Sequence, residues 1–354
     1  MEKLFKKIIF NTKKNILFSL IFSVLLGLSF IYKIIITTKR KRGYKLEAGD
    51  SFIISIGNLT TGGTGKTPFA IFLANKLAKK YKVCIILRGY KSRYNKKPFL
   101  IKNLYKYSAI QLGDEPLLIA QETKLPVIIS KKRIDGIKYA KKKIKPQIII
   151  LDDAFQHFQL KRNINIVLID YFNPFGNKYL LPAGILREPI DALKDADYVI
   201  ITKYEKIVKK EYSFKKLKSI IKSINPNTKL FASNFILSEL RINNRKVNLK
   251  KYLHKKVLII SGIANPEYFE FLVKRYLKPK KIFSLTFPDH HYYRKKDIEL
   301  IINESQKYDI IITTEKDYIK LKKFNIPIFV FKIKFNFQNE KEFLKAIANE
   351  IKKN

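Results

Sequence analysis

The 354-residue sequence contains no tryptophan, one methionine, one cysteine and few acidic residues. A single cysteine, Cys84, cannot form an intrachain disulfide, which excludes the disulfide-rich secreted class and fits a reducing cytosolic setting. Cys84 lies within the apolar run 83–87, so we expect a small core residue. Only 29 Asp and Glu residues oppose 72 Lys and Arg residues, giving a formal net charge of +43.

This positive charge first suggests a nucleic-acid-binding protein. The lysines, however, are spread along the whole chain, together with abundant Ile, Asn and Tyr. That pattern is typical of a general compositional drift and not of one binding patch. We therefore expect no nucleic acid as a partner, and an anionic membrane surface or a phosphorylated substrate instead.

The longest uncharged stretch runs from Ile16 to Tyr32 and continues, after one lysine, to Ile36. As a helix, 16–36 would extend about 31 Å, roughly one hydrocarbon thickness. A basic cluster at 39–42 follows in place of a signal-peptide cleavage site. A buried amphipathic helix is disfavoured because apolar residues surround the axis. We predict that 1–42 is a membrane-anchoring helix; its basic flanks at both ends leave open whether it spans the bilayer or lies in one leaflet.

A glycine-rich turn follows an expected strand at 52–56 and precedes an expected helix from about Thr67 to Lys80. Its candidate nucleotide-binding residues are Thr60, Thr61, Gly62, Gly63, Thr64, Gly65, Lys66 and Thr67. Glycines let backbone N–H groups surround a polyphosphate, and the helix N-terminus favours negative charge. Lys66 should reach the terminal phosphates and the Thr67 hydroxyl should bind Mg²⁺. Thr60 stands where the first glycine of a phosphate-binding loop (P-loop) is expected, but the remaining motif still predicts nucleotide binding.

Short apolar runs alternate with helical patterns through most of the chain, which predicts an α/β fold. Further strands are expected at 83–87, 126–129, 147–151, 164–169, 229–235, 256–260, 282–286, 309–313 and 327–331, and the segment 197–205 ends another strand. Together with the P-loop, this order predicts an NTPase-like, mostly parallel sheet flanked by helices. We expect a P-loop core domain over 43–225 and a second, smaller α/β domain over 226–354, with the boundary in the Lys-, Asn- and Ser-rich stretch 206–250.

Two acidic pairs are candidates for chemistry. Asp152 and Asp153 follow the strand 147–151, where such sheets place the carboxylate that organises Mg²⁺, and either could be the ligand. Asp114 and Glu115 precede a proline, which is also a good helix start. For that second pair the residues alone leave a structural and a catalytic role open.

A polar loop and a weak motif are further candidates. Arg187 and Glu188 lie between prolines in the loop 181–189, which is either a surface connection or a binding segment. The motif at 202–205 is similar to a guanine-reading motif but has Glu where that motif requires Asp.

The chain has four histidines: His157, His254, His290 and His291. All except His254 lie in short polar motifs. An Asp–His sequence after a strand, as at 289–290, can form an oriented acid/base pair. Adjacent histidines usually point apart, which disfavours a metal site there. The segment 313–317 also follows an expected strand and is a candidate for the same cleft as the Asp–His sequence at 289–290.

Six motifs occur in one order along nearly the whole chain: Gly57–Pro68, Arg88–Tyr90, Gly113–Pro116, Leu151–His157, Pro182–Pro189 and Phe287–His290. As a set they resemble the tetraacyldisaccharide 4′-kinases of lipid A (lipopolysaccharide) biosynthesis. The resemblance implies transfer of the ATP γ-phosphate, with Mg²⁺, to the 4′-hydroxyl of a tetraacyldisaccharide 1-phosphate, which forms a lipid IVA-type product. It implies an acylated glucosamine disaccharide 1-phosphate as partner, and the cytoplasmic face of the bacterial inner membrane as location.

The resemblance also implies roles for single residues. Asp114 and His290 would form a catalytic pair beside Lys66, and Asp152 or Asp153 would organise Mg²⁺. Substrate binding would involve Arg88, Glu115, His157, Arg187 and Glu188. Two alternatives stay open, namely a membrane-associated nucleotide switch or targeting ATPase without a lipid acceptor, and a basic nucleic-acid-binding protein. A monomer is expected, and acyl-chain preference is not determined by the sequence.

Overall fold

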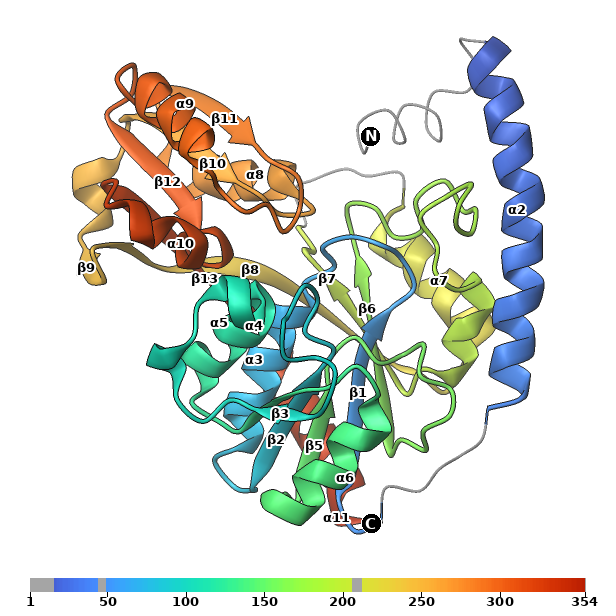
Figure 1. Ribbon diagram of the computed structural model, residues 1–354. Coiled ribbons are helices and arrows are strands. Elements are labelled where there is room, and N and C mark those ends of the chain that lie inside the picture. Colours follow the sequence, from blue (N-terminus) through green and yellow to red (C-terminus); the bar gives the residue numbers. More distant parts are fainter. Residues whose placement is uncertain (1–15, 44–48, 206–211, 354) are drawn as a thin grey trace.

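The computed structural model describes residues 16–43, 49–205 and 212–353. A single mixed sheet with the strand order β11-β10-β12-β13-β8-β7-β6-β1-β5-β2-β4-β3, and with β9 paired to β8, runs through this part of the chain (Figure 1). The strands are β1 (Phe52–Asn58), β2 (Val83–Leu87), β3 (Phe99–Leu100), β4 (Val127–Ile129), β5 (Ile148–Leu151), β6 (Ile164–Asp170), β7 (Tyr198–Thr202), β8 (Lys229–Ile242), β9 (Arg245–Val247), β10 (Lys256–Ser261), β11 (Lys281–Thr286), β12 (Ile310–Thr314) and β13 (Ile328–Phe337).

Helices cover both faces of the sheet. The α-helices are α2 (Ile16–Lys41), α3 (Lys66–Leu77), α4 (Ala109–Leu112), α5 (Asp114–Thr123), α6 (Arg133–Lys143), α7 (Phe214–Ile224), α8 (Pro266–Leu277), α9 (Lys295–Ser305), α10 (Glu315–Leu321) and α11 (Glu340–Lys352). Four short 3-10 helices complete the described elements: η2 (Leu104–Lys106), η3 (Ile190–Asp195), η4 (Leu249–Tyr252) and η5 (Lys322–Phe324).

The predicted α/β class, with its mostly parallel sheet and flanking helices, is confirmed. β1, β2, β4 and β5 are buried along their whole length, as expected for strands covered on both faces. The sequences of β2, β4 and β5 are apolar throughout, which predicts this burial. Cys84 lies in β2 as a fully buried core residue. The short strands β3 and β9 were not predicted, because runs of two or three residues carry no periodic signal.

The order of the central strands decides where a ligand can bind. β1 pairs in parallel with both β5 and β6, so the segments that follow these three strands meet at one edge of the sheet. That edge therefore brings the glycine-rich turn after β1 close to Asp152 and Asp153 after β5. It is also the edge at which parallel α/β sheets bind their ligands.

A second lobe contains β10, β11 and β12 with α8, α9 and α10, and it lies at the upper left in Figure 1. Two long antiparallel strands, β8 and β13, connect it to the first lobe, with a register shift between Lys332 and Ile333. The start of β8 pairs in parallel with β7, so one sheet continues through both lobes. The division into domains at residue 225 stays a prediction, since the sheet has no break there.

The end of the described chain returns to the first lobe. Phe343 and Ile347 of α11 are fully buried in the same core as Ile54 of β1 and Phe69 of α3. The ring of Phe343 lies 6.1 Å from that of Phe69, measured between ring centroids. The first lobe is thus closed by the last helix.

The N-terminal helix α2 lies alongside the first lobe, next to α7, in Figure 1. The predicted helix from Ile16 to Ile36 is confirmed, and its basic flank within residues 1–15 lies outside the described residues. Of the described helices, α2 alone is long and apolar enough to cross a membrane.

Candidate active site

The glycine-rich turn has the backbone that a phosphate-binding loop needs. Gly62 and Gly65 have φ angles of +111° and +89°, in the region that favours glycine. A Cβ at Gly65 would also lie 2.7 Å from Cζ of Phe235. Gly65 caps α3, so the first turn of α3, with Lys66 and Thr67, directly follows the loop. The helix N-terminus therefore faces the position where an anion would bind.

Lys66 lies among oxygen atoms at this edge. Its Nζ donates to Oδ1 of Asn58 at 3.2 Å and lies 3.4 Å from Oδ1 of Asp153. Asp153 is also contacted by Nη1 of Arg187, at 2.9 and 3.0 Å from its two oxygens. Burial alone would raise the pKa of Asp153, but the charges of Lys66 and Arg187 outweigh it and hold this pKa below its ordinary value. Asp153 is thus an ionised carboxylate next to the P-loop lysine.

Asp152 has a different environment. Its side chain is buried, and within the described part of the chain its Oδ1 has no hydrogen-bond partner. Burial, followed by the charges of Glu115 and Asp153, raises the pKa of Asp152 to about 7. Nη2 of the buried Arg133 donates to the Asp152 carbonyl at 2.8 Å and fixes the backbone there. A buried carboxylate oxygen without a protein partner requires an explanation, and a bound cation would supply one.

The residues at this edge fit Mg²⁺. Magnesium in phosphoryl-transfer sites takes one or two carboxylates, with phosphate oxygens and waters completing its shell. Among the described residues no three His, Cys, Asp or Glu side chains form a metal-binding group, so a fully protein-built site is not indicated. Asp152, Asp153 and the Thr67 hydroxyl supply a donor set of the kind that magnesium and a nucleotide share.

Asp114 and His290 are in direct contact although 176 positions separate them. Nδ1 of His290 lies 2.8 Å from Oδ1 and 3.0 Å from Oδ2 of Asp114. Asp114 is the first residue of α5 and its Oδ1 also accepts the Glu115 N–H at 3.0 Å. Asp114 therefore both begins a helix and contacts the second lobe. The structural role is observed, and the catalytic role stays a prediction.

Lysines of α10 surround this pair. Lys316 Nζ donates to Nε2 of His290 at 3.3 Å, and Lys320 Nζ lies 3.6 Å from Oδ2 of Asp114. Since an ammonium can only donate, Nε2 accepts and Nδ1 carries the proton that His290 donates to Asp114. Burial alone would raise the pKa of Asp114, but the His290 hydrogen bond and the two lysine charges hold it well below its ordinary value.

Glu115 links the two halves of the site. Its carboxylate lies 3.8 Å from Lys316 of the second lobe. It is also the largest charge contribution to the raised pKa of Asp152, which places it near the P-loop side. The structure thus brings the predicted Lys66, Asp152, Asp114 and His290 to one region between the lobes.

His157 and Arg88 lie on the P-loop side. Burial and the charge of Arg133 lower the pKa of His157 to about 4, with Arg88 contributing in the same direction. His157 is therefore an uncharged ring at neutral pH, able to donate or accept a hydrogen bond. Arg88 follows β2 and is exposed, as a group that meets a ligand from solvent would be.

Arg187 and Glu188 point in different directions. Arg187 contacts Asp153, as described above, and so belongs to the phosphate side of the site. The Glu188 side chain is fully buried and pairs with Arg40 of α2. Burial raises the pKa of Glu188, and the charge of Arg40 opposes this effect.

The motif at 202–205 supports the P-loop from behind. The Thr202 hydroxyl donates to the Thr64 carbonyl at 2.9 Å, and Lys203 Nζ donates to the Gly63 carbonyl at 2.7 Å. Glu205 accepts from Arg275 at 2.7 Å. These contacts give the motif a local structural role and leave Glu205 engaged with α8.

His291 points away from the pair, as predicted for adjacent histidines. Its Nε2 lies 3.0 Å from Oδ2 of Asp297, on α9. Arg133, whose guanidinium is buried against the Asp152 carbonyl, was not among the predicted site residues. The available signal was its residue type, since Arg133 is the one arginine in the lysine-rich segment 131–143.

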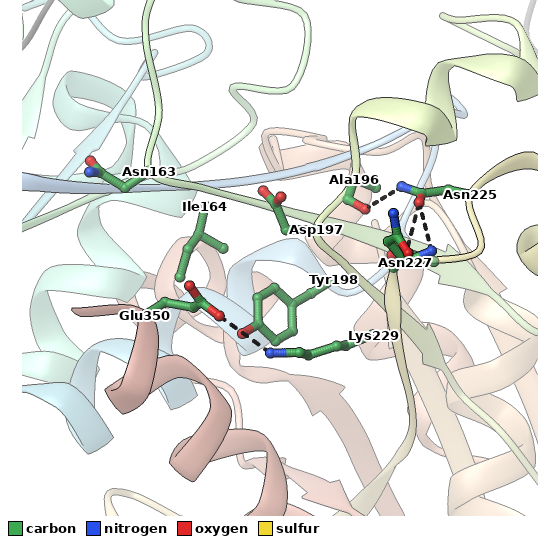
Figure 2. Close-up of a pocket in the computed structure, with 10 residues that line it drawn as sticks. Asn163, Ile164, Ala196, Asp197, Tyr198, Asn225, Asn227, Lys229 and Glu350 are labelled. Carbon is green, nitrogen blue, oxygen red and sulfur yellow. Dashed lines mark hydrogen bonds and ion pairs between the residues drawn. The ribbon is translucent and has the colours of Figure 1, made fainter. Parts of the chain in front are cut away.

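The opposite edge of the sheet carries a separate pocket. Figure 2 shows it lined by Ile164, Tyr198 and Lys229, at the starts of β6, β7 and β8, and by Glu350 of α11. The phosphate-binding turn lies beyond the carboxyl end of β1, at the other edge. This pocket is therefore not part of the candidate active site.

Comparison with protein families gives a match to one family model, described as tetraacyldisaccharide-1-P 4′-kinase, over residues 21–352. A tetraacyldisaccharide 4′-kinase from Halothermothrix orenii is 36% identical over 298 residues, 78% of this chain and 76% of that protein. Another from Francisella tularensis subsp. novicida is 35% identical over 329 residues, 90% of this chain and 94% of that protein.

A solved structure is similar over almost the same range. The crystal structure of Aquifex aeolicus LpxK, an "apo" form in complex with ATP, superposes with a TM-score of 0.71 at 28% identity. The match covers 94% of this chain and 99% of that chain. The likeness thus includes both lobes.

Proposed function

Since the chain belongs to the tetraacyldisaccharide-1-phosphate 4′-kinase family, we propose that it transfers the γ-phosphate of ATP to the 4′-hydroxyl of a tetraacyldisaccharide 1-phosphate. The product would be a 4′-phosphorylated lipid A precursor of the lipid IVA type. The observation that carries the proposal is the Asp114–His290 contact, made between the lobes beside a P-loop. An enzyme that only hydrolysed a nucleotide would not need this second acid/base group.

Binding and charge neutralisation fall to the P-loop side. Backbone N–H groups of residues 60–67 would surround the phosphates, and Lys66 would contact the terminal ones. Lys66 faces Asn58 and Asp153, so its ammonium is held close to the loop. Preorganised charge of this kind costs no reorganisation during the reaction.

Mg²⁺ would be held by Asp152 or Asp153 with Thr67, and when bound it supplies positive charge to the transferring phosphoryl group. The partnerless buried oxygen of Asp152 supports this assignment. Asp153 already pairs with Lys66 and Arg187. We therefore propose that Asp152 is the direct Mg²⁺ ligand and that Asp153 links Lys66 to Arg187 beside it.

The acceptor would be activated from the other lobe. As the sugar oxygen bonds to the γ-phosphorus, the bond to the β-phosphate oxygen breaks, ADP leaves, and the hydroxyl proton passes to the Asp114–His290 pair. His290 orients the Asp114 carboxylate through Nδ1. Glu115 lies near both this pair and Asp152. We propose that Glu115, Arg88 and His157 contact the disaccharide or its phosphates.

We propose that the enzyme works at the cytoplasmic face of the inner membrane, with α2 along the surface and not across the bilayer. Contacts with the first lobe are made from Phe22, whose ring meets Tyr179, to Arg40, which pairs with Glu188. If α2 crossed the hydrocarbon with these contacts intact, the part of the first lobe packed along it would be drawn into the bilayer together with its charged side chains. The outer face of α2 is apolar, with Leu17, Leu20, Val24, Leu28, Phe30, Ile31, Ile34 and Ile35 between 46% and 65% exposed.

The direct test is incubation of the purified chain with ATP, Mg²⁺ and an acylated glucosamine disaccharide 1-phosphate in detergent, followed by mass spectrometry. A gain of one phosphate on the lipid, with ADP released in equal amount, is expected. ADP release that does not depend on the lipid would favour the nucleotide switch or targeting ATPase instead. Light scattering of the same sample tests the expected monomer.

A further inference from the structure

We propose that α2 is part of the catalytic apparatus as well as the membrane anchor, with Tyr32 and Arg40 acting as positioning residues for Arg187 and the P-loop. The proposal rests on the function proposed above. It concerns the loop 179–189, which lies between α2 on one side and the nucleotide-binding turn on the other. A helix that served only as an anchor would not need specific polar contacts with that loop.

Arg40 makes two ion pairs with the first lobe. Nη2 lies 2.5 Å from Oε2 of Glu188, and Nη1 contacts the carboxylate of Asp195. The guanidinium also lies over the rings of Phe155 and Phe158, 5.2 and 4.7 Å from their centroids. Phe155 belongs to the segment directly after Asp152 and Asp153, so Arg40 contacts both segments that form the phosphate side.

Tyr32 and Ser29 contact the backbone of the same loop. The Tyr32 hydroxyl donates to the Arg187 carbonyl at 2.9 Å, and the Ser29 hydroxyl donates to the Leu180 carbonyl at 2.9 Å. The contacting positions 22, 29, 32 and 40 are separated by seven, three and eight residues, which places them on one side of a helix. One stripe of α2 is thus specific for the loop while the outer face stays apolar.

The loop is in turn hydrogen-bonded to the nucleotide-binding turn. The Arg187 N–H donates to the Leu59 carbonyl at 2.7 Å, and the Thr61 N–H donates to the Ile185 carbonyl at 2.7 Å. Thr60 and Leu186 form an isolated antiparallel bridge. Through its side chain, Arg187 then contacts Asp153, which lies 3.4 Å from Lys66. The path from Tyr32 to Lys66 therefore has three contacts.

The burial of Glu188 makes this arrangement sensitive to Arg40. The Glu188 side chain is 0% exposed, and an ionised carboxylate without a partner is costly in such a place. Loss of the Arg40 charge should force the Glu188 segment to shift towards water or to take up a proton. Because Arg187 is the preceding residue, such a shift would move its guanidinium away from Asp153.

The test compares Arg40→Gln with Lys39→Gln in the full-length chain. Lys39 is exposed and adjacent, so both variants remove one positive charge from the same end of α2. Binding to vesicles containing an anionic phospholipid should weaken at least as much in Lys39→Gln, because the Lys39 ammonium is exposed whereas the Arg40 guanidinium is paired with two carboxylates. In detergent with saturating substrates, where membrane attachment does not matter, Arg40→Gln should lower kcat about tenfold or more, and Lys39→Gln should stay within about twofold. Tyr32→Phe, which loses only the hydroxyl, should lower kcat a few-fold.

The outcomes separate this inference from the proposed function. If the unaltered chain transfers no phosphate to the lipid, the proposed function fails. If it does, and Arg40→Gln and Lys39→Gln have equal kcat, α2 is only an anchor and the inference is wrong. Should Arg40→Gln not fold, as judged by its melting temperature, Tyr32→Phe decides, because a folded variant with unchanged kcat would overturn the positioning role.

Discussion

The contact between Asp114 and His290 predicts that the two residues act as one unit in catalysis. The variants are Asp114→Asn, His290→Ala and the double variant, with Asn chosen because it keeps the shape of the first turn of α5. If Asp114 served only to begin that helix, Asn would replace it with little change in stability or turnover, because Asn and Asp are about equally favourable at a helix start. A catalytic role instead lowers kcat by a factor on the order of 10².

The loss of kcat in the double variant shows whether the two residues act together or independently. Each single loss of about 10² corresponds to about 2.7 kcal/mol of activation free energy. Nδ1 of His290 lies within hydrogen-bonding distance of both Asp114 oxygens, so removal of either residue ends the same interaction. We therefore expect the double variant to lose about 10², whereas independent roles would multiply to about 10⁴.

The assay measures kcat from ADP release at saturating ATP and lipid, with melting temperatures recorded for each variant. The KM for ATP should change little, because the P-loop is untouched. His291→Ala is the matched control, since His291 faces Asp297 and should keep most activity. If all three variants fold and the losses in kcat multiply fully, Asp114 and His290 do not act as one unit, even if each residue matters by itself.

Four further predictions concern the P-loop, the metal and the dependence on pH. Lys66→Ala should abolish transfer by removing a charge that contributes several kcal/mol to the transition state, and a kcat equal to that of the unaltered chain would contradict the P-loop assignment. The magnesium concentration needed for half-maximal activity should fall as pH rises from 6 to 8, because a ligand must be ionised and the pKa of Asp152 is raised to about 7. Asp152→Asn should weaken magnesium binding, so that the magnesium concentration needed for half-maximal activity rises and no longer depends on pH in this range. Magnesium titrations measure both changes. The pKa of Asp114 in the folded chain lies below its unfolded value of about 3.9, so its ionised form stabilises the fold above that pH. This stabilisation is lost as the pH falls towards the folded-state pKa. The difference in unfolding free energy between the unaltered chain and Asp114→Asn, measured by urea titration, should therefore shrink between pH 6 and pH 3. Gly65→Ala should lower the melting temperature and weaken ATP binding, since φ is +89° and its Cβ would meet Phe235, whereas Gly27→Ala in α2, with no atom within 4 Å of its Cβ, should do neither.

Most strands could be predicted from the sequence because their apolar runs are short and bounded by turn residues. The strand β2 was placed to the residue, and the other predicted strands were placed within a few residues, except that β8 and β13 extend further than predicted. Those two strands extend far beyond the predicted ranges, since their later halves mix polar residues with buried apolar ones such as Leu240 and Phe335. Such mixed segments give only a weak local signal.

The candidate site was predicted only in part. The P-loop and the paired aspartates were visible because they follow strands in sequence, whereas the contact between Asp114 and His290 came from a family resemblance. Spacing along the chain contains no information about which side chains meet across two lobes. The same limit applies to Arg40, whose basic cluster at 39–42 suggested a membrane flank, although Arg40 itself points inward to Glu188.

The packing of α11 against the first lobe has a consequence for biosynthesis. Phe343 and Ile347 complete the core that surrounds Ile54 and Phe69, so this core cannot close until the ribosome has passed residue 347. The apolar helix α2 is translated long before then and can reach a bilayer early. Folding of the catalytic lobe would therefore be completed on a chain already held at the membrane, where exposed strands are kept apart from those of other nascent chains.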